Sequence, residues 1–230
     1  MKNIDYHIRT STRAKRLSLS VSSSKGLEVV VPLNTSQRAI EKFLAANRAW
    51  ITKHQHLIDA SKQPFVLPTS IKLQALDKSW DIIYASVQAK RLSIKTFPEK
   101  ILLSKSNPSK PLFQKAIKIF LKQVAMEHFP THLEQLSQKH QLPFEQLTFH
   151  VQKTRWGSCS HEKNIALNAA LLFMPIETVH YVMIHELCHT QHLNHSKCFW
   201  EKVAKYMPDY DQHKKILNQP EQYLPSWLWL

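Results

Sequence analysis

Glycine is nearly missing from this 230-residue chain, which contains only two, Gly26 and Gly157. Phosphate-binding loops and the dinucleotide-binding fingerprint need several glycines at fixed spacing, so the sequence excludes both. Cysteine is also rare: there are three, Cys159, Cys188 and Cys198, and no two of them form a CxxC pair. A small, odd number argues against a disulfide framework and against a cysteine-rich zinc site. It predicts free, buried thiols instead.

Long apolar runs and acidic residues are scarce as well. No stretch reaches the roughly 18 consecutive apolar residues of a membrane-spanning helix. Residues 1–7 contain no apolar core of a secretory signal, so the sequence predicts a cytoplasmic protein without a membrane segment. The chain contains 17 Asp and Glu residues and 31 Lys and Arg residues, so its net charge is +14. This excess favours anionic partners, although scattered lysines also serve solubility alone.

Short strands and one helix are predicted in the first hundred residues. Apolar residues alternate at 17–21 and continue at 27–31, with Gly26 between them, which is typical of a β-hairpin. A helix of about 20 residues is expected to follow Ser36, its candidate N-cap, and to reach Leu57. Further strand-like runs lie at 71–75, 80–84, 92–96 and 101–103.

The two prolines near residue 108 mark the best candidate for a domain boundary. A long helix is expected from there to about His140, with Pro130 as a candidate break. The elements expected after it are strands at 147–151 and 164–168 and helices at 176–193 and 196–206. We therefore expect a β-rich region with one long helix over residues 1–108 and a second, metal-binding domain over residues 109–230.

The clearest chemical signal is an HExxH pattern, His185-Glu186-Leu187-Cys188-His189. Residues four apart on an α-helix advance about 400° and 6 Å, so both imidazoles project from one face. They can then share one metal ion at about 2.0–2.1 Å. Glu186 lies beside that face, where a general base takes a proton from water held by the metal. The flanking residues are apolar nearly all round, which predicts a buried helix whose His and Glu need a compensating ion.

A catalytic zinc ion needs a third protein ligand. His195 lies six residues beyond His189 and would face away on a continuing helix, so the chain has to turn first. Asn194 is expected to supply that turn in a left-handed conformation. His192, on the helical face of the first two histidines, and Glu201, on the following helix, are alternative third ligands. A purely structural zinc site is a further alternative.

Several motifs follow one another in the order and spacing of a known family. They are TRWGSCS at 154–160, IALN at 165–168, YVMIHELCH at 181–189, NHS at 194–196 and FW at 199–200. With these motifs the chain resembles the YgjP-like metallopeptidase family over most of its length. The resemblance implies an α+β fold in which a zincin-like catalytic domain sets its active-site helix beside a small mixed sheet. It also implies one Zn²⁺ ion held by His185, His189 and His195, with Glu186 as the catalytic residue.

The RWGSC segment predicts how the substrate binds. In zincins an edge strand beside the active-site helix pairs with the extended substrate backbone, and residues 165–168 are the expected strand. Arg155 and Asn168 are the candidate substrate-binding residues. Arg155 would stabilise an anionic transition state or bind a substrate carboxylate or phosphate. Tyr206 and Tyr210 are candidate oxyanion donors.

These features predict a zinc-dependent hydrolase, with a peptide as the leading substrate. A phosphoanhydride, as in a nucleotide, is the second hypothesis, because the charge of +14 and Arg155 favour anions and HExxH chemistry does not settle the bond. The third is a basic nucleic-acid-binding protein in which a zinc ion only shapes the fold. No helix-turn-helix or zinc-finger spacing supports the third.

Overall fold

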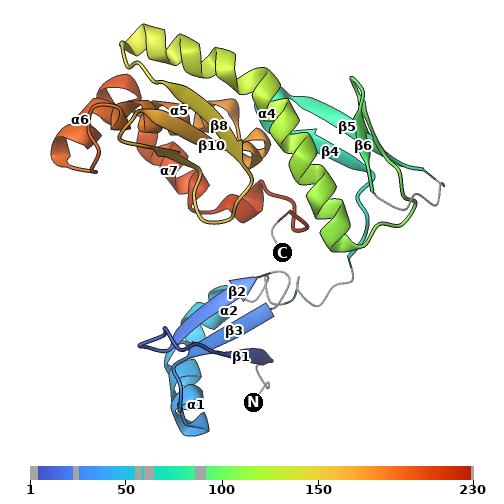
Figure 1. The fold of residues 1–230 in the computed structure, drawn as a ribbon. Helices are drawn as coiled ribbons and strands as arrows, with labels where there is room; N and C mark the ends of the chain where they lie inside the picture. Colours follow the sequence, from blue (N-terminus) through green and yellow to red (C-terminus); the bar gives the residue numbers. More distant parts are fainter. Residues whose placement is uncertain (1–4, 23–25, 55–58, 60–64, 86–91, 229–230) are drawn as a thin grey trace. The chain divides into compact units, whose positions relative to one another are not determined.

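The computed structural model of the protein describes residues 5–22, 26–54, 59, 65–85 and 92–228 (Figure 1). The chain divides into two compact units, Met1–Val66 with Pro225–Leu230, and Leu67–Leu224. This division falls well before the boundary expected near residue 108. Residues 67–108 belong to the second unit because their strands pack against the helix and the buried turn that follow them.

A three-stranded sheet forms the framework of the first unit. Its central strand, β3 (Gly26–Val31), pairs in parallel with β1 (Tyr6–Thr10) and antiparallel with β2 (Ser18–Ser22). The hairpin predicted between the second and third strands is therefore present, while the sequence patterns did not predict β1. β3 is buried along most of its length, because its apolar side chains share a core with those of the helices.

Residues 26–54 of this unit contain the helices α1 (Gln37–Ala46) and α2 (Arg48–Lys53), where the sequence predicted a single long helix. Ser36 is the N-cap of α1, as expected, and its side chain accepts a backbone hydrogen bond from the first turn. The helix breaks at Asn47, whose side-chain amide donates to a carbonyl of the last turn of α1 at 2.8 Å. Leu57, the predicted end, lies outside the described residues.

The described part of the second unit holds a four-stranded and a three-stranded sheet. The four-stranded sheet has the order β4-β5-β7-β6, formed by Ser70–Leu73, Lys78–Tyr84, Lys100–Leu103 and Ile94–Thr96. All four predicted strand-like runs therefore form strands. The run at 71–75 ends in a short 3-10 turn, η1 (Gln74–Leu76).

The three-stranded sheet has the order β8-β10-β9. Its central strand, β10 (Asn164–Asn168), pairs in parallel with β8 (Gln146–His150) and antiparallel with β9 (Gly157–Cys159). Residues 165–168 are thus central, and the expectation that they form an edge strand is wrong. The edge strand that packs against the HExxH helix is β9, which lies between the two strands predicted at 147–151 and 164–168.

Helix α4 (Lys110–His140) spans this unit and packs against both of its sheets (Figure 1). Pro130 lies inside it, and the break expected there does not occur. The apolar face of α4 is fully buried and includes Phe113, Phe120 and Phe129. None of the helices formed by the described residues is both long enough and apolar enough to cross a membrane.

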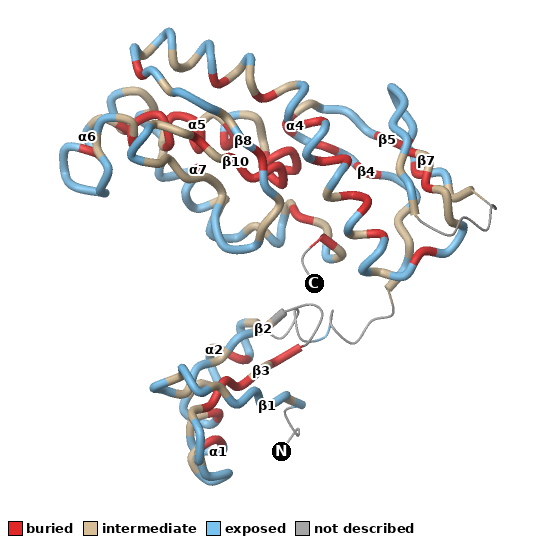
Figure 2. The backbone as a smooth tube through the Cα atoms, viewed as in Figure 1, coloured by how far each residue is buried: buried red, intermediate tan, exposed pale blue. Residues whose placement is uncertain are grey.

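Helix α5 (Ile176–His189) lies in the interior of the unit, and Figure 2 shows it buried along much of its length. It packs against α4, β9, α6 (Lys197–Tyr206) and α7 (Tyr210–Leu217). The predicted burial of this helix is confirmed, but the helix ends at residue 189 rather than 193. The packing of this helix beside a small mixed sheet confirms the predicted α+β fold.

Candidate metal centre

His185 and His189 project from α5 one turn apart, as the HExxH spacing predicts. Their ring centroids lie 4.9 Å from each other. His189 is buried and His185 half-buried, and Glu186, between them in sequence, is 5% exposed. The two histidines therefore lie at the edge of the buried interior, and His185 and Glu186 help to line a cavity.

His195 reaches these histidines through a turn that begins where α5 ends. Thr190 caps the helix in a right-handed conformation (φ −64°, ψ −14°), and its hydroxyl donates to the Leu187 carbonyl at 2.8 Å. Asn194 does not have a positive φ, so the left-handed turn predicted there is wrong. The Thr190 hydroxyl, together with backbone bonds of residues 190–192 to the last turn, satisfies the helix end without a left-handed residue.

The side chains of His185, His189 and His195 converge on one point. One potential ligand atom from each of them lies within 4.8 Å of the other two, and no other such group of metal-binding side chains occurs among the described residues. The Nε2 atoms of His185 and His195 are 3.1 Å apart. Tetrahedral zinc with bonds of 2.0–2.1 Å separates its ligand atoms by about 3.3 Å. The spacing thus fits a single ion of this kind.

The two alternative third ligands lie in other arrangements. His192 contributes its backbone carbonyl, which lies 2.8 Å from Nδ1 of His189. Glu201 pairs with Lys197 at 3.7 Å on the surface of α6. Neither residue belongs to the converging group.

The histidines on α5 are held in the form that binds metal. Because Nδ1 of His189 donates to the His192 carbonyl, its Nε2 keeps a free lone pair. Burial lowers the pKa of His189, and it lowers that of His185 to about 3, with help from the charges of His189, His195 and Lys214. Both rings are therefore neutral near pH 7, as metal binding requires.

Two aromatic rings of α6 pack against the three imidazoles. Phe199 is fully buried, and its ring centroid lies 4.4 Å from that of His189 and 4.9 Å from those of His185 and His195. Trp200 stacks on His195 at 5.6 Å. This packing orients His185 in particular, since its Nδ1 is buried without a hydrogen-bond partner in the described part of the chain.

Gly157 of β9 lies directly against the carboxylate of Glu186. A Cβ atom at this position would come within 2.5 Å of Oε1 and 2.8 Å of Cδ of Glu186, so any other residue here would force the Glu186 side chain to move. Burial raises the pKa of the Glu186 carboxyl to about 8, and the charge of Arg155 acts in the opposite direction. The close approach of β9 thus shields the carboxylate from water and fixes its position beside the histidines.

The outer edge of β9 has free backbone groups beside Glu186. The Trp156 carbonyl accepts a hydrogen bond from the Asn168 amide at 2.8 Å, and the other end of β9 bonds to β10 in the same way. Since bonded and non-bonded pairs alternate in antiparallel strands, Gly157 and Cys159 direct their N–H and C=O groups away from β10. No strand in the described part of the chain pairs with this edge.

The candidate substrate-binding residues occupy different positions. Asn168 is 2% exposed, and its side-chain amide donates to the carbonyls of Gln152 and Arg155 at 2.7 and 2.9 Å. Its oxygen accepts from the Ala170 amide, so the side chain is fully used in holding the loop that carries Arg155. Arg155 is exposed, and its charge acts on Glu186. A direct role for either residue in substrate binding stays a prediction.

The thiols offer no competing chemistry at this site. All three cysteines are free, as predicted, although only Cys188 is buried, while Cys159 is half-buried and Cys198 exposed. Burial raises the pKa of Cys188 to about 12. Burial, reinforced by the charge of Glu186, raises that of Cys159 to about 11. These two thiols therefore stay protonated, and a protonated thiol is neither a good nucleophile nor a metal ligand.

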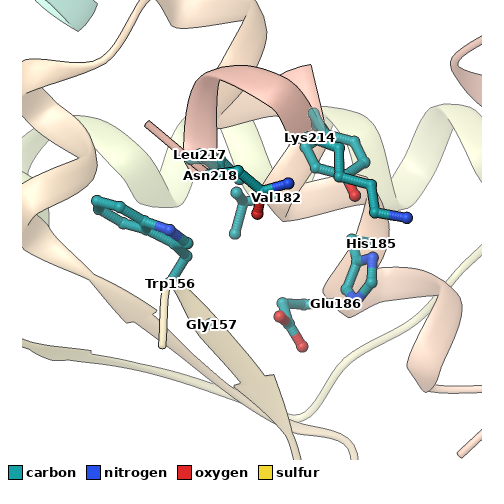
Figure 3. A pocket seen from close by; sticks show the side chains of 9 residues that line it. Trp156, Gly157, Val182, His185, Glu186, Lys214, Leu217 and Asn218 are labelled. Carbon is teal, nitrogen blue, oxygen red and sulfur yellow. The ribbon is translucent and has the colours of Figure 1, made fainter. Parts of the chain in front are cut away.

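A cavity of about 240 Å³ adjoins His185 and Glu186 (Figure 3). Sequence patterns missed two parts of its wall. One is Tyr181, whose only signal is its position one turn before His185 on the same helical face. The other is formed by α7 and its C-terminal end, for which the sequence patterns predicted no element. The wall residues there are Lys214, Leu217 and Asn218.

A buried helix with HExxH histidines beside a small mixed sheet, and a third histidine close by, is the arrangement of metallopeptidases of the zincin type. A family model described as YgjP-like, metallopeptidase domain, matches residues 15–220. The chain therefore belongs to the YgjP-like metallopeptidase family, as its motifs predicted.

Comparison with solved structures adds a structural likeness. The chain is similar to the crystal structure of the metallopeptidase zymogen of Pyrococcus abyssi abylysin, with 25% sequence identity and a TM-score of 0.36. The match covers 41% of this chain and 93% of that one. No curated protein matches the chain.

Proposed function

We propose that the protein is a zinc-dependent peptidase in which His185, His189 and His195 hold one Zn²⁺ ion and Glu186 is the general base. The observation that carries this proposal is the convergence of the three imidazoles within 4.8 Å, with Glu186 next to His185 on the same helix. Membership in a metallopeptidase family supports a metal-dependent hydrolase and a peptide substrate. The comparisons lend no support to a nucleotide substrate or to an anionic macromolecular partner.

When bound, a zinc ion supplies Lewis-acid chemistry, since it polarises a carbonyl oxygen and makes water more acidic. The nearby positive charge of the ion would counter the burial of Glu186 and keep its carboxyl group ionised. The carboxylate then accepts the proton of the attacking water and passes it to the leaving amine. Gly157 keeps the carboxylate in place during both transfers, because the backbone of β9 leaves it no room to move toward the sheet.

The edge of β9 positions the substrate in this mechanism. An extended peptide that pairs with the outward N–H and C=O groups of Gly157 and Cys159 runs alongside α5 as an added strand. Its scissile carbonyl is then brought next to Glu186, which Gly157 touches. This assigns to β9 the function that the sequence patterns assigned to residues 165–168.

Tyr181 is the side chain best placed to stabilise the oxyanion. It lies one turn before His185, is 4% exposed and lines the cavity beside Glu186. Burial raises the pKa of its phenol to about 12, so the group keeps its proton and acts as a donor. We expect Tyr181→Phe to lower kcat for peptide cleavage by about 10²-fold, the usual effect of losing one oxyanion donor, with little change in KM.

Tyr206→Phe is the matched control for this measurement. The Tyr206 ring packs on His140 at 4.3 Å, so it faces α4 rather than the metal site. We expect its kcat to match that of the unchanged protein. A Tyr181→Phe variant with unchanged kcat would remove Tyr181 from the mechanism.

Metal analysis and a substrate screen test the proposed function together. We expect purified protein to contain about one equivalent of zinc, and the zinc-loaded protein to cleave members of a fluorogenic peptide library. A nucleotide panel assayed in parallel should release no phosphate or pyrophosphate. Release of either without peptide cleavage would replace the peptidase by a phosphoanhydride hydrolase, and a protein that binds no metal would refute both.

A further inference from the structure

The cavity beside the metal centre has apolar walls and polar groups at both ends. Its volume of about 240 Å³ equals that of roughly eight water molecules at about 30 Å³ each, which is room for one amino-acid side chain. Trp156, Val182 and Leu217 form apolar walls, whereas Lys214 and Asn218 bring polar groups from α7. The cavity is therefore shaped for a side chain with an aliphatic stem and a polar tip.

Lys214 brings a positive charge to this cavity that no acidic side chain neutralises. In the part of the chain that the structure describes, it forms no ion pair with a carboxylate. Its Nζ atom lies 4.6 Å from the ring centroid of Trp200, which stacks on His195. The lysine is thus held at the rim by a cation–π contact, with its charge available to a ligand.

The carboxylate of Glu186 points away from Lys214 and does not neutralise its positive charge. Figure 3 shows the Lys214 side chain reaching from α7 toward the His185 ring, while the Glu186 carboxylate points away from α7. That orientation agrees with the close contact between Glu186 and Gly157 on β9. The cavity consequently has its general base at one end and its cation at the other.

We propose that this cavity is a specificity subsite that selects an acidic residue next to the scissile bond of a peptide substrate, with Lys214 as the specificity-determining residue. The stem of a glutamate packs against Val182 and Leu217, its carboxylate pairs with Lys214, and the Asn218 amide donates a hydrogen bond. The inference rests on the proposed peptidase function and adds the class of substrate to it.

Charge reversal tests the subsite. The probes are fluorogenic hexapeptides that differ only in Glu, Gln or Lys at the residue on either side of the scissile bond. At low salt we expect kcat/KM to be about tenfold higher for Glu than for Lys at one of these positions. Lys214→Glu should reverse that preference. Lys215→Glu changes the net charge equally on the same helix but does not line the cavity, so it should keep the original preference.

Binding to the zinc-loaded Glu186→Gln variant separates this inference from the proposed function. Its Kd for the same peptides, measured by calorimetry, should favour Glu, and the added Lys214→Glu change should abolish that preference. If peptides are cleaved but Lys214→Glu leaves the preference as it was, the subsite is overturned and the peptidase stands. If the Glu peptides bind selectively through Lys214 but are never cleaved, the subsite stands and the peptidase fails. If no peptide is cleaved or bound, both fall.

Discussion

Glu186→Gln is expected to lower the rate of peptide hydrolysis by about 10²- to 10⁴-fold, the contribution of a positioned general base. Glutamine keeps the size and shape of the side chain, so it fits against Gly157 as glutamate does. It cannot accept a proton from water, however, and the step that generates the nucleophile is lost. The variant should still bind zinc, because Glu186 is not among the three residues that converge as ligands.

Glu177→Gln is the matched control for this experiment. Glu177 lies in the first turn of the same helix, is exposed and does not line the cavity. The measurements are initial rates on one peptide and zinc content by mass spectrometry, for both variants. Loss of activity in Glu186→Gln with zinc retained supports the assigned role. Full activity, or the loss of zinc together with activity, contradicts it.

The positions of His185, Glu186 and His189 could be predicted because helix geometry alone determines them. A four-residue spacing in a segment that is apolar nearly all round leaves little choice, and α5 is buried as that pattern predicts. Helix geometry does not determine the position of His195, because the helix ends between His189 and His195. Its convergence with the other two was implied by the family motifs, and the mechanism expected for the turn was wrong. A threonine side chain that bonds back to the last helical turn replaced the left-handed asparagine.

The strand order near the site could not be predicted from local patterns. The short apolar run within 164–168 predicts a strand, but whether that strand is central or at the edge depends on which segments pair with it. The pairing of β9 is short, and its sequence, Gly157-Ser158-Cys159, has low strand propensity. It forms a strand because it pairs with β10 and packs against α5. These are tertiary contacts, which local sequence patterns do not show.

Helix α7 was missed for a related reason. It is only eight residues long and mostly polar, so few apolar residues mark it as a helix in the sequence. It is stabilised by contacts with α5 and by aromatic stacking, such as that of Tyr210 on Trp200 at 5.4 Å. The residues proposed to select the substrate lie on this helix and at its end. The sequence therefore indicated the chemistry of the site better than its specificity.

Gly157→Ala should separate catalysis from stability. The added Cβ would lie within 2.5–2.8 Å of the Glu186 side chain, so the carboxylate has to swing away from β9. A displacement of about 1 Å in a catalytic group can cost roughly 10²-fold in rate. We expect a loss of kcat of at least that size. The zinc content should not change, because β9 contributes none of the three converging histidines.

The thermal unfolding midpoint of this variant decides how the result is interpreted. The clash involves the end of a flexible side chain rather than the backbone, so Glu186 can relieve it by rotation and the midpoint should stay close to that of the unchanged protein. Ser158→Ala is the control, since the next residue on the strand directs its side chain to the other face of the sheet. If Gly157→Ala cleaves peptides at the normal rate, proton transfer by Glu186 does not depend on the contact of its carboxylate with β9. If the unfolding midpoint of Gly157→Ala falls together with its cleavage rate, the glycine serves the fold rather than the reaction.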